Sequence, residues 1–145
     1  MNKLRLILGN QLYPLSEIKH DAQSQIYMCE DLGLCTNVKH HKSKIALFFT
    51  AMRAYRDQLL AHGYDVHYKD CNNDFTLSYT DKLRDFIKQN SIDELIFYEI
   101  EDKPFEKELF KLIDELKIKY TVLESLMFID SRSSFKQFCE GKKFL

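Results

Sequence analysis

The stretch LRLILGN, residues 4–10, holds a short apolar run that stops at Gly9 and Asn10. Four to eight apolar residues bounded by turn formers are typical of a strand buried on both faces of a parallel sheet. Similar runs recur along the chain, and one segment alternates apolar and polar residues as a half-buried strand does. The sequence therefore predicts five strands, at residues 4–8, 25–29, 64–68, 94–98 and 120–123.

The longest helical pattern covers residues 41–62 and ends before Gly63, a residue suited to a C-terminal cap. Apolar side chains recur there at steps of three and four, which predicts one buried stripe along the helix. The stripe comprises Ile45, Phe48, Phe49, Met52, Tyr55, Leu59 and Leu60.

Three further helices are expected between and after the strands. Ser78 or Thr80 would cap the first of them, and Pro104 would stand in the first turn of the second, where its missing N–H costs nothing. Because strands and helices alternate, we expect an α/β protein, with a Rossmann-like open parallel five-stranded sheet and helices on both faces. The length fits one domain, residues 1–145. The three helices are expected at 78–89, 104–116 and 131–139.

The composition is that of an ordinary globular protein. The chain is 45% hydrophobic and 30% charged, with a net charge of −1. A domain that binds DNA through its own phosphate contacts would be more basic. No apolar run approaches the ~20 residues that a membrane-spanning helix needs. The first eight residues lack a signal peptide's apolar region, so we expect a cytoplasmic protein without membrane contact.

Metal binding is not expected from the residue spacings. Neighbouring His40 and His41 would point to different sides of a helix, which argues against their sharing a metal. The cysteines form no CxxC or Cys/His pattern. We expect reduced thiols with a structural or incidental role at Cys29, Cys35, Cys71 and Cys139.

Gly9, Asn10 and Gln11 form the first candidate site, because open parallel sheets bind ligands beyond the carboxyl ends of their strands. Gly9 permits a close approach to the backbone, and both amides donate and accept hydrogen bonds. The chain has no GxGxxG or Walker sequence. The segment is either a ligand-binding turn or an ordinary strand-to-loop turn.

A basic cluster, KHHKSK at residues 39–44, is the second candidate. Cations at a helix N-terminus oppose the helix dipole by roughly 0.3–1 kcal/mol each, so the cluster indicates an acidic partner: a carboxylate, a phosphate or another domain. Glu30, after the second predicted strand, is one internal partner of this kind. A solvated basic face is the alternative.

The third candidate is the acidic stretch EIED, residues 99–102, after the fourth predicted strand. Its carboxylates would either bind ribose or ribityl hydroxyls or act as solvated and capping groups. The sequence offers no set of nucleophile, base and acid, so we expect this chain alone to be non-catalytic.

Several segments carry a family resemblance: LRLILGNQL at 4–12, VKHHKSKIAL at 38–47, TAMR at 50–53, and the tail 135–145. On these residues the chain resembles the amino-terminal domain of the deoxyribodipyrimidine photolyase-related proteins. That family includes the bacterial 6-4 photolyases and cryptochromes that carry an iron–sulfur cluster. The His-His-x-x-Lys segment with the following Ala-Met-Arg is the more specific part.

The resemblance implies an antenna domain that binds 6,7-dimethyl-8-ribityllumazine and passes excitation to a flavin. FAD, the iron–sulfur cluster and DNA contacts would belong to a carboxy-terminal catalytic domain of the same full-length protein, outside this chain. The full-length protein would then be a photolyase-like lyase or a cryptochrome. The implied chromophore-binding residues are Gly9, Asn10, Gln11, Glu30, His41 and Ile45.

The chain departs from the family pattern at three positions. Asn10 stands where the family usually has Asp, and Leu34 and Asn37 stand where it offers a Glu and a Tyr to the lumazine. Each lost polar contact costs on the order of 1 kcal/mol, so weaker lumazine binding is expected.

Two other functions stay open at this point. One is a nucleotide- or small-molecule-binding Rossmann-like protein, with phosphate contacts at Gly9, Asn10 and the basic cluster. The other is a structural interaction domain whose basic cluster docks an acidic partner. The basic pair and apolar residues at 141–145 lead us to expect that more chain follows in the full protein.

Overall fold

Five parallel strands form one open sheet in the computed structural model, which describes residues 2–18, 24–36, 38–71 and 76–142. Their order across the sheet is β3-β2-β1-β4-β5, and each neighbouring pair is parallel. The predicted Rossmann-like α/β class is therefore confirmed. The strands are β1 (Lys3–Leu6), β2 (Ser24–Cys29), β3 (Val66–Lys69), β4 (Glu94–Tyr98) and β5 (Lys119–Leu123).

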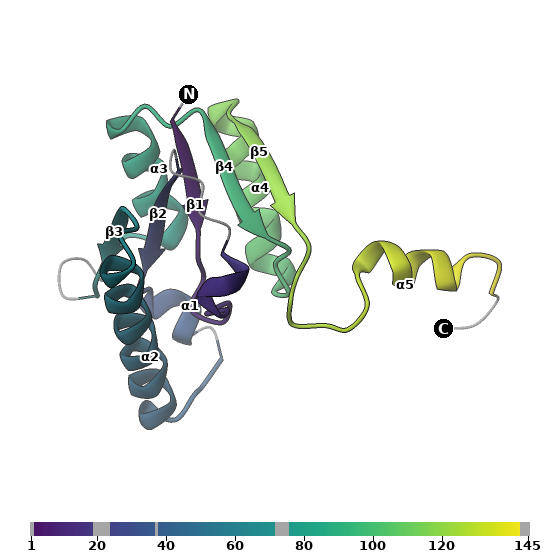
Figure 1. The fold of residues 1–145 in the computed structure, drawn as a ribbon, viewed down its shortest axis with the longest axis horizontal. Helices are drawn as coiled ribbons and strands as arrows, with labels where there is room; N and C mark the ends of the chain where they lie inside the picture. The colour runs from purple at the N-terminus through teal and green to yellow at the C-terminus, as the bar shows by residue number, and fades with distance from the viewer. Residues whose placement is uncertain (1, 19–23, 37, 72–75, 143–145) are drawn as a thin grey trace.

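The strand order places helices on both faces of the sheet. The chain moves from β1 through β2 to β3, then crosses back to β4 beside β1 and continues to β5. Because right-handed crossovers that run in opposite directions cover opposite faces, α2 packs on one face and α3 and α4 on the other (Figure 1). The helical elements are η1 (Leu15–Glu17), α1 (Leu32–Thr36), α2 (Lys42–Ala61), α3 (Tyr79–Gln89), α4 (Lys103–Leu116) and α5 (Arg132–Cys139).

Each face of the sheet has its own apolar cluster. On one face Leu83 of α3 and Leu109 of α4, both fully buried, pack with Leu95 of β4. On the other face Leu59 of α2 packs with Ile26 of β2. Burial of such side chains contributes roughly 1.5–3 kcal/mol each, so both crossover layers are held by apolar contact.

The predicted stripe on α2 is wrong at one residue. Leu60 is 49% exposed, whereas its neighbour Leu59 is fully buried. Adjacent residues lie about 100° apart around a helix, and only one of the two can face the sheet.

The predicted strand at 64–68 begins two residues later, at Val66. The N–H groups of Gly63 and Tyr64 still donate to the carbonyls of Leu60 and Leu59, at 3.0 and 3.1 Å, so the backbone there completes α2. Gly63 adopts φ +80°, as expected of its cap position.

Polar residues cap the helices that follow. Ser78 is the cap of α3 and accepts a hydrogen bond from the N–H of Asp81 at 3.2 Å, so of the two expected caps it is Ser78 that serves. Asp102 caps α4 by accepting from the N–H of Phe105 at 3.1 Å. The short helix α1, which the sequence did not predict, begins after Asp31, whose Oδ1 accepts from Leu34 N.

After β5 the chain leaves the sheet, and α5 stands apart from the body (Figure 1). We call residues 124–142 the carboxy-terminal arm. Arg132 fastens it to the body through hydrogen bonds to Glu106 Oε1 and the carbonyl of Ile100. The end of the expected family tail, residues 143–145, lies outside the described residues, as does Asn37. Among the helices described, none has the length and apolar character to cross a bilayer.

Candidate functional site

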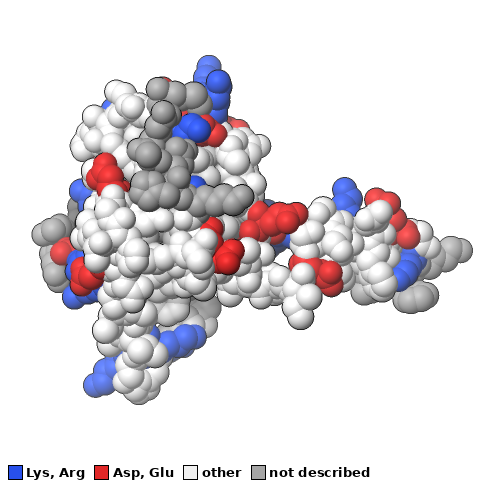
Figure 2. Space-filling model, viewed as in Figure 1, with Lys and Arg blue, Asp and Glu red and all other residues white. Residues whose placement is uncertain are grey.

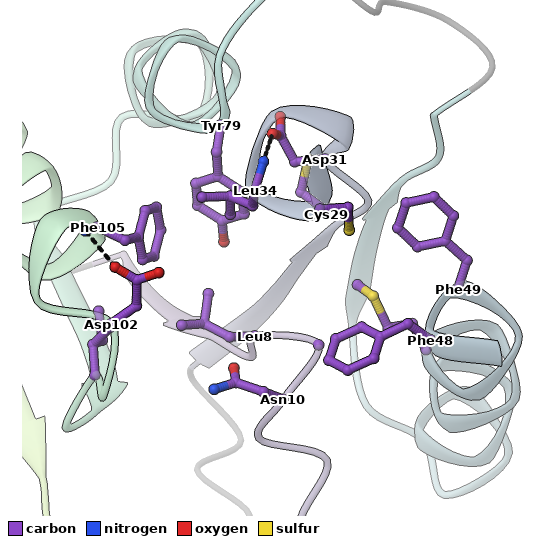
Figure 3. Close-up of a pocket in the computed structure, with 14 residues that line it drawn as sticks. Leu8, Asn10, Cys29, Asp31, Leu34, Phe48, Phe49, Tyr79, Asp102 and Phe105 are labelled. Carbon is purple, nitrogen blue, oxygen red and sulfur yellow. Dashed lines mark hydrogen bonds between the residues drawn. The ribbon is translucent and has the colours of Figure 1, made fainter. Parts of the chain in front are cut away.

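A cavity of about 200 Å³ opens at the carboxyl ends of β1, β2 and β4 (Figure 3). This is the edge of the sheet where open parallel folds bind ligands. Residues from α1, α2, α3 and the start of α4 complete its wall. The wall combines apolar groups, including Leu8, Leu34, Phe48, Phe49 and Phe105, with polar groups from Asn10, Asp31, Tyr79 and Asp102.

Gly9 lets α2 approach the end of β1. A Cβ at this position would lie 2.7 Å from Met52 Sδ and 2.8 Å from Phe48 Cε1, closer than side chains pack. The close approach that the sequence predicted is therefore made by side chains of α2. It sets Phe48 and Met52 into the cavity wall.

Asn10 and Gln11 join the loops that follow β1, β4 and β5. Gln11, 1% exposed, donates from Nε2 to the carbonyl of Glu99 at 2.8 Å and to Glu101 Oε2 at 3.3 Å. Asn10 Nδ2 donates to the same Glu101 oxygen at 3.3 Å, and Ser125 Oγ donates to Glu101 Oε1 at 2.8 Å. In the acidic stretch, Glu101 thus organises loops, and its neighbour serves as a helix cap. Residues 99–102 were expected either to bind ribose or ribityl hydroxyls or to act as solvated and capping groups. The second interpretation accounts for the observed contacts of Glu101 and Asp102.

Glu30 is fully buried and holds a separate hydrogen-bond network whose members do not line the cavity. Arg53 Nε and Nη2 donate to its two carboxylate oxygens at 2.6 and 2.9 Å, Tyr68 Oη donates at 2.6 Å, and the N–H of Cys71 donates at 3.0 Å. Burial opposes ionisation, but these donors outweigh it and lower the pKa of Glu30 to about 2. The suggested pairing of Glu30 with the basic cluster is therefore wrong, because Arg53 of α2 takes that place.

His41 is the cap of α2. Its Nδ1 accepts a hydrogen bond from Ser43 N at 3.2 Å, and its side chain is exposed. Lys42 and Lys44 are exposed as well, and blue basic groups lie among uncharged residues at this end of α2 in Figure 2. The ring of His41 therefore satisfies the first turn of a helix that carries no acidic residue there.

Ile45 lines a smaller cavity of about 180 Å³ beside the main one, which shares Leu34, Cys35 and Phe48 with it. The structure thus places the expected site residues in different surroundings. Gly9 and Asn10 line the main cavity, and Ile45 lines the smaller one. The other three line neither cavity: Gln11 bonds the loop after β4, Glu30 bonds Arg53, and His41 caps α2.

Several cavity residues were not expected from the sequence. Tyr79 is the first residue of α3, and Asp31 follows β2 and pairs with Lys82 Nζ at 2.9 Å. The expected cap at Ser78 was a signal for Tyr79, because it marks where α3 begins. A crossover helix begins at the edge of the sheet where the preceding strand ends, which is the edge that holds the cavity. Cys29 also lines the cavity, and burial raises the pKa of its thiol to about 11.

The four cysteines are free thiols. Within the part of the chain that the structure describes, no three His, Cys, Asp or Glu side chains are grouped as a metal would require.

Comparison with known proteins places the chain in a family. The family model for deoxyribodipyrimidine photo-lyase-related protein matches residues 5–145. The (6-4) photolyase of Agrobacterium fabrum (strain C58 / ATCC 33970) is 28% identical over 149 residues, which cover 100% of this chain and 29% of that protein. The chain thus spans less than a third of the length of this relative. On the strength of the family match over nearly all of its residues, the chain belongs to the deoxyribodipyrimidine photo-lyase-related proteins.

Proposed function

We propose that residues 1–145 form the amino-terminal antenna or docking domain of a light-dependent flavoprotein that repairs DNA or senses light. The observation that carries the proposal is the cavity of about 200 Å³ at the carboxyl edge of the sheet, in a member of a photolyase-related family. FAD, an iron–sulfur cluster and DNA contacts are assigned to a downstream domain. The 29% coverage of the Agrobacterium protein is consistent with such a division.

The dimensions of the cavity suit a ring chromophore. An apolar cavity of about 150 Å³ admits benzene, so one of about 200 Å³ with the exposed groups of Asn10 and Asp102 at its rim has room for fused rings. We propose 6,7-dimethyl-8-ribityllumazine as the occupant, which would supply absorption at the blue–violet edge. Gly9, Phe48 and Phe105 would hold the rings.

A second cavity, of about 390 Å³, adjoins the first and shares Asp31, Tyr79 and Asp102 with it. Its wall includes more polar groups, among them Ser78 and Lys82. These offer hydrogen bonds to the hydroxyls of a ribityl tail. In this proposal Gln11 and Glu30 act on the chromophore indirectly, by holding the loops and α2 that form the cavity wall.

Substitution of Gly9 by valine tests the antenna proposal. The added atoms would displace Phe48 and Met52 into the cavity, because even a Cβ lies within 2.8 Å of both. We expect the wild-type chain to bind 6,7-dimethyl-8-ribityllumazine in a fluorescence titration, and Gly9→Val to bind at least about tenfold more weakly, a loss of about 1.4 kcal/mol.

The matched control is Leu47→Val, on the exposed side of α2, where the side chain is 70% exposed and outside the cavity wall. This variant should bind as the wild type does. A wild-type protein that is stabilised by ATP or NAD in a thermal-shift assay, and not by the lumazine, would instead favour the nucleotide-binding alternative.

The docking half of the proposal is supported by the carboxy-terminal arm. Large apolar side chains there face solvent, and residues other than Lys, Arg, Asp and Glu make up much of its visible surface (Figure 2). Exposed apolar patches of this kind mark interaction surfaces. The exposed residues are Leu126, Met127, Phe128, Ile129, Phe135 and Phe138.

The double substitution Phe128→Glu and Phe135→Glu tests this surface. Both side chains are more than half exposed, at 62% and 56%, so the free energy of unfolding of the chain should stay within about 0.5 kcal/mol of wild type. In the polypeptide extended by its downstream domain, we expect limited proteolysis to cut the double variant near the arm faster than wild type. Equal protection of both proteins would contradict docking at the arm, and loss of a dimer formed by the 145-residue chain alone would assign the surface to self-association.

A further inference from the structure

The hydroxyl of Tyr79 is a buried polar group at the cavity. The residue is 3% exposed, and the described residues offer no hydrogen-bond partner to its Oη. Its ring is held edge-on by Phe105 and Tyr27, with centroids 5.1 and 6.2 Å away and interplanar angles of 89° and 87°. The hydroxyl is therefore fixed in place by packing and left unsatisfied, which costs stability in a folded protein.

Tyr79 projects from the start of α3 and directs its hydroxyl toward the middle of the cavity (Figure 3). Burial, with smaller contributions from Cys29 and Asp31, raises the pKa of this phenol well above its ordinary value. It therefore keeps its proton at neutral pH and is able to donate a hydrogen bond. The ligand atom that receives this hydrogen bond must be an acceptor.

Asp102 supplies an acceptor on the other side of the same cavity. Its Oδ1 accepts from the N–H of Phe105 at 3.1 Å, and its second oxygen turns toward the cavity in Figure 3. Asp31 also lines the cavity and is paired with Lys82. Two carboxylates at one cavity disfavour an anionic group such as a phosphate.

We infer that Tyr79 is the specificity-determining residue of this cavity, and that it selects an uncharged planar heteroaromatic ring whose carbonyl oxygen accepts from Tyr79 Oη and whose ring N–H donates to Asp102. This inference rests on the proposed function. It specifies that the edge of the chromophore with the carbonyl and N–H groups faces Tyr79 and Asp102. The phenyl rings of Phe48 and Phe49 and the side chain of Leu34 line the rest of the space. A ring without that donor and acceptor would leave Tyr79 unsatisfied and bind less well.

Tyr79→Phe separates this role from a structural one. Removing an unpaired buried hydroxyl should leave the unliganded protein as stable as wild type or more so. Affinity for 6,7-dimethyl-8-ribityllumazine should fall about 5- to 30-fold. The loss should be confined to ligands with a ring carbonyl, so quinoxaline, which has none, should bind both proteins equally weakly.

Tyr27→Phe is the matched control. Tyr27 is fully buried, and among the described residues only the thiol of Cys29, a weak hydrogen-bonding group, lies beside its Oη. Unlike Tyr79, it does not line the cavity. This variant should bind the lumazine as wild type does. Fluorescence titration measures the affinities, and thermal unfolding of the free proteins measures their stability.

The outcomes distinguish this inference from the antenna proposal. Equal lumazine affinity of wild type and Tyr79→Phe, or a destabilised free Tyr79→Phe, would overturn the role of Tyr79 and leave the antenna proposal intact. If the wild type binds xanthine but not the lumazine, and Tyr79→Phe loses affinity for xanthine, the antenna proposal alone is overturned. Binding of neither ring compound to wild type would overturn both.

Discussion

Replacement of Glu30 by alanine is expected to lower the free energy of unfolding by about 3 kcal/mol. The carboxylate is fully buried and receives hydrogen bonds from Arg53, Tyr68 and Cys71, which tie α2, β3 and the loop after β3 to the end of β2. Without it the Tyr68 hydroxyl and the Cys71 N–H lose their acceptor. The Arg53 side chain is 44% exposed and can be rehydrated, which keeps the loss from being larger.

Urea unfolding followed by circular dichroism measures this effect. Glu124→Ala is the matched control, because Glu124 is exposed and its replacement should change stability by less than about 0.5 kcal/mol. A Glu30→Ala protein as stable as the control would show that the network adds nothing net to the fold.

The Glu30 carboxylate also makes stability depend on pH in a defined window. Its pKa falls from an ordinary 4.5 in the unfolded chain to about 2 in the folded protein. Its contribution is therefore complete above pH 4.5 and is lost as the pH falls toward 2, a change of about 3 kcal/mol. Glu30→Gln lacks this ionisable carboxylate. The difference in free energy of unfolding between wild type and variant should therefore narrow as the pH falls from 4.5 toward 2. A difference that stays constant from pH 5 to pH 2 would contradict the lowered pKa.

Replacement of Leu59 by alanine is expected to cost about 2–5 kcal/mol. Leu59 is fully buried where α2 packs against β2, in a cluster with Ile26, Met28 and Met52. The loss combines the transfer free energy of the removed atoms with the cavity that they leave. Because Met52 also lines the ligand cavity, lumazine binding should weaken together with stability.

Leu60→Ala is the adjacent control on the same helix. Its side chain is 49% exposed, so its loss should change the free energy of unfolding by about 0.5 kcal/mol or less. Equal losses at Leu59 and Leu60 would show that the helix is rotated relative to the sheet. Chemical unfolding of the two variants under the same conditions decides this.

The position of the cavity follows from the strand order more than from any motif. β1 lies between β2 and β4, so the loops after these three strands meet at one edge. In the sequence, the residues that follow them, such as Gly9, Asp31 and Asp102, are separated by tens of positions. Only the rule that ligands bind at the carboxyl ends of parallel strands connected Gly9 and Asn10 with such a site.

Sequence reasoning located the strands and helices well because each leaves a local periodic signal. The alternation in 64–68 extended β3 too early, since Tyr64 belongs by hydrogen bonding to the end of α2. The short helix α1, residues 32–36, has too few turns to show a period. Leu60 looked buried because either of two adjacent leucines satisfies a pattern with steps of three and four.

By itself the sequence determined the α/β class, the number of strands and the turn at Gly9, because strands and helices leave a periodic pattern and glycine, which has no side chain, marks turns and close approaches. Only the tertiary structure decided which charged groups meet. It paired Glu30 with Arg53 instead of the basic cluster, and at the cavity none of the described residues hydrogen-bonds the Tyr79 hydroxyl. Such contacts join residues from different crossovers, and their geometry is fixed when the sheet and its two helix layers pack.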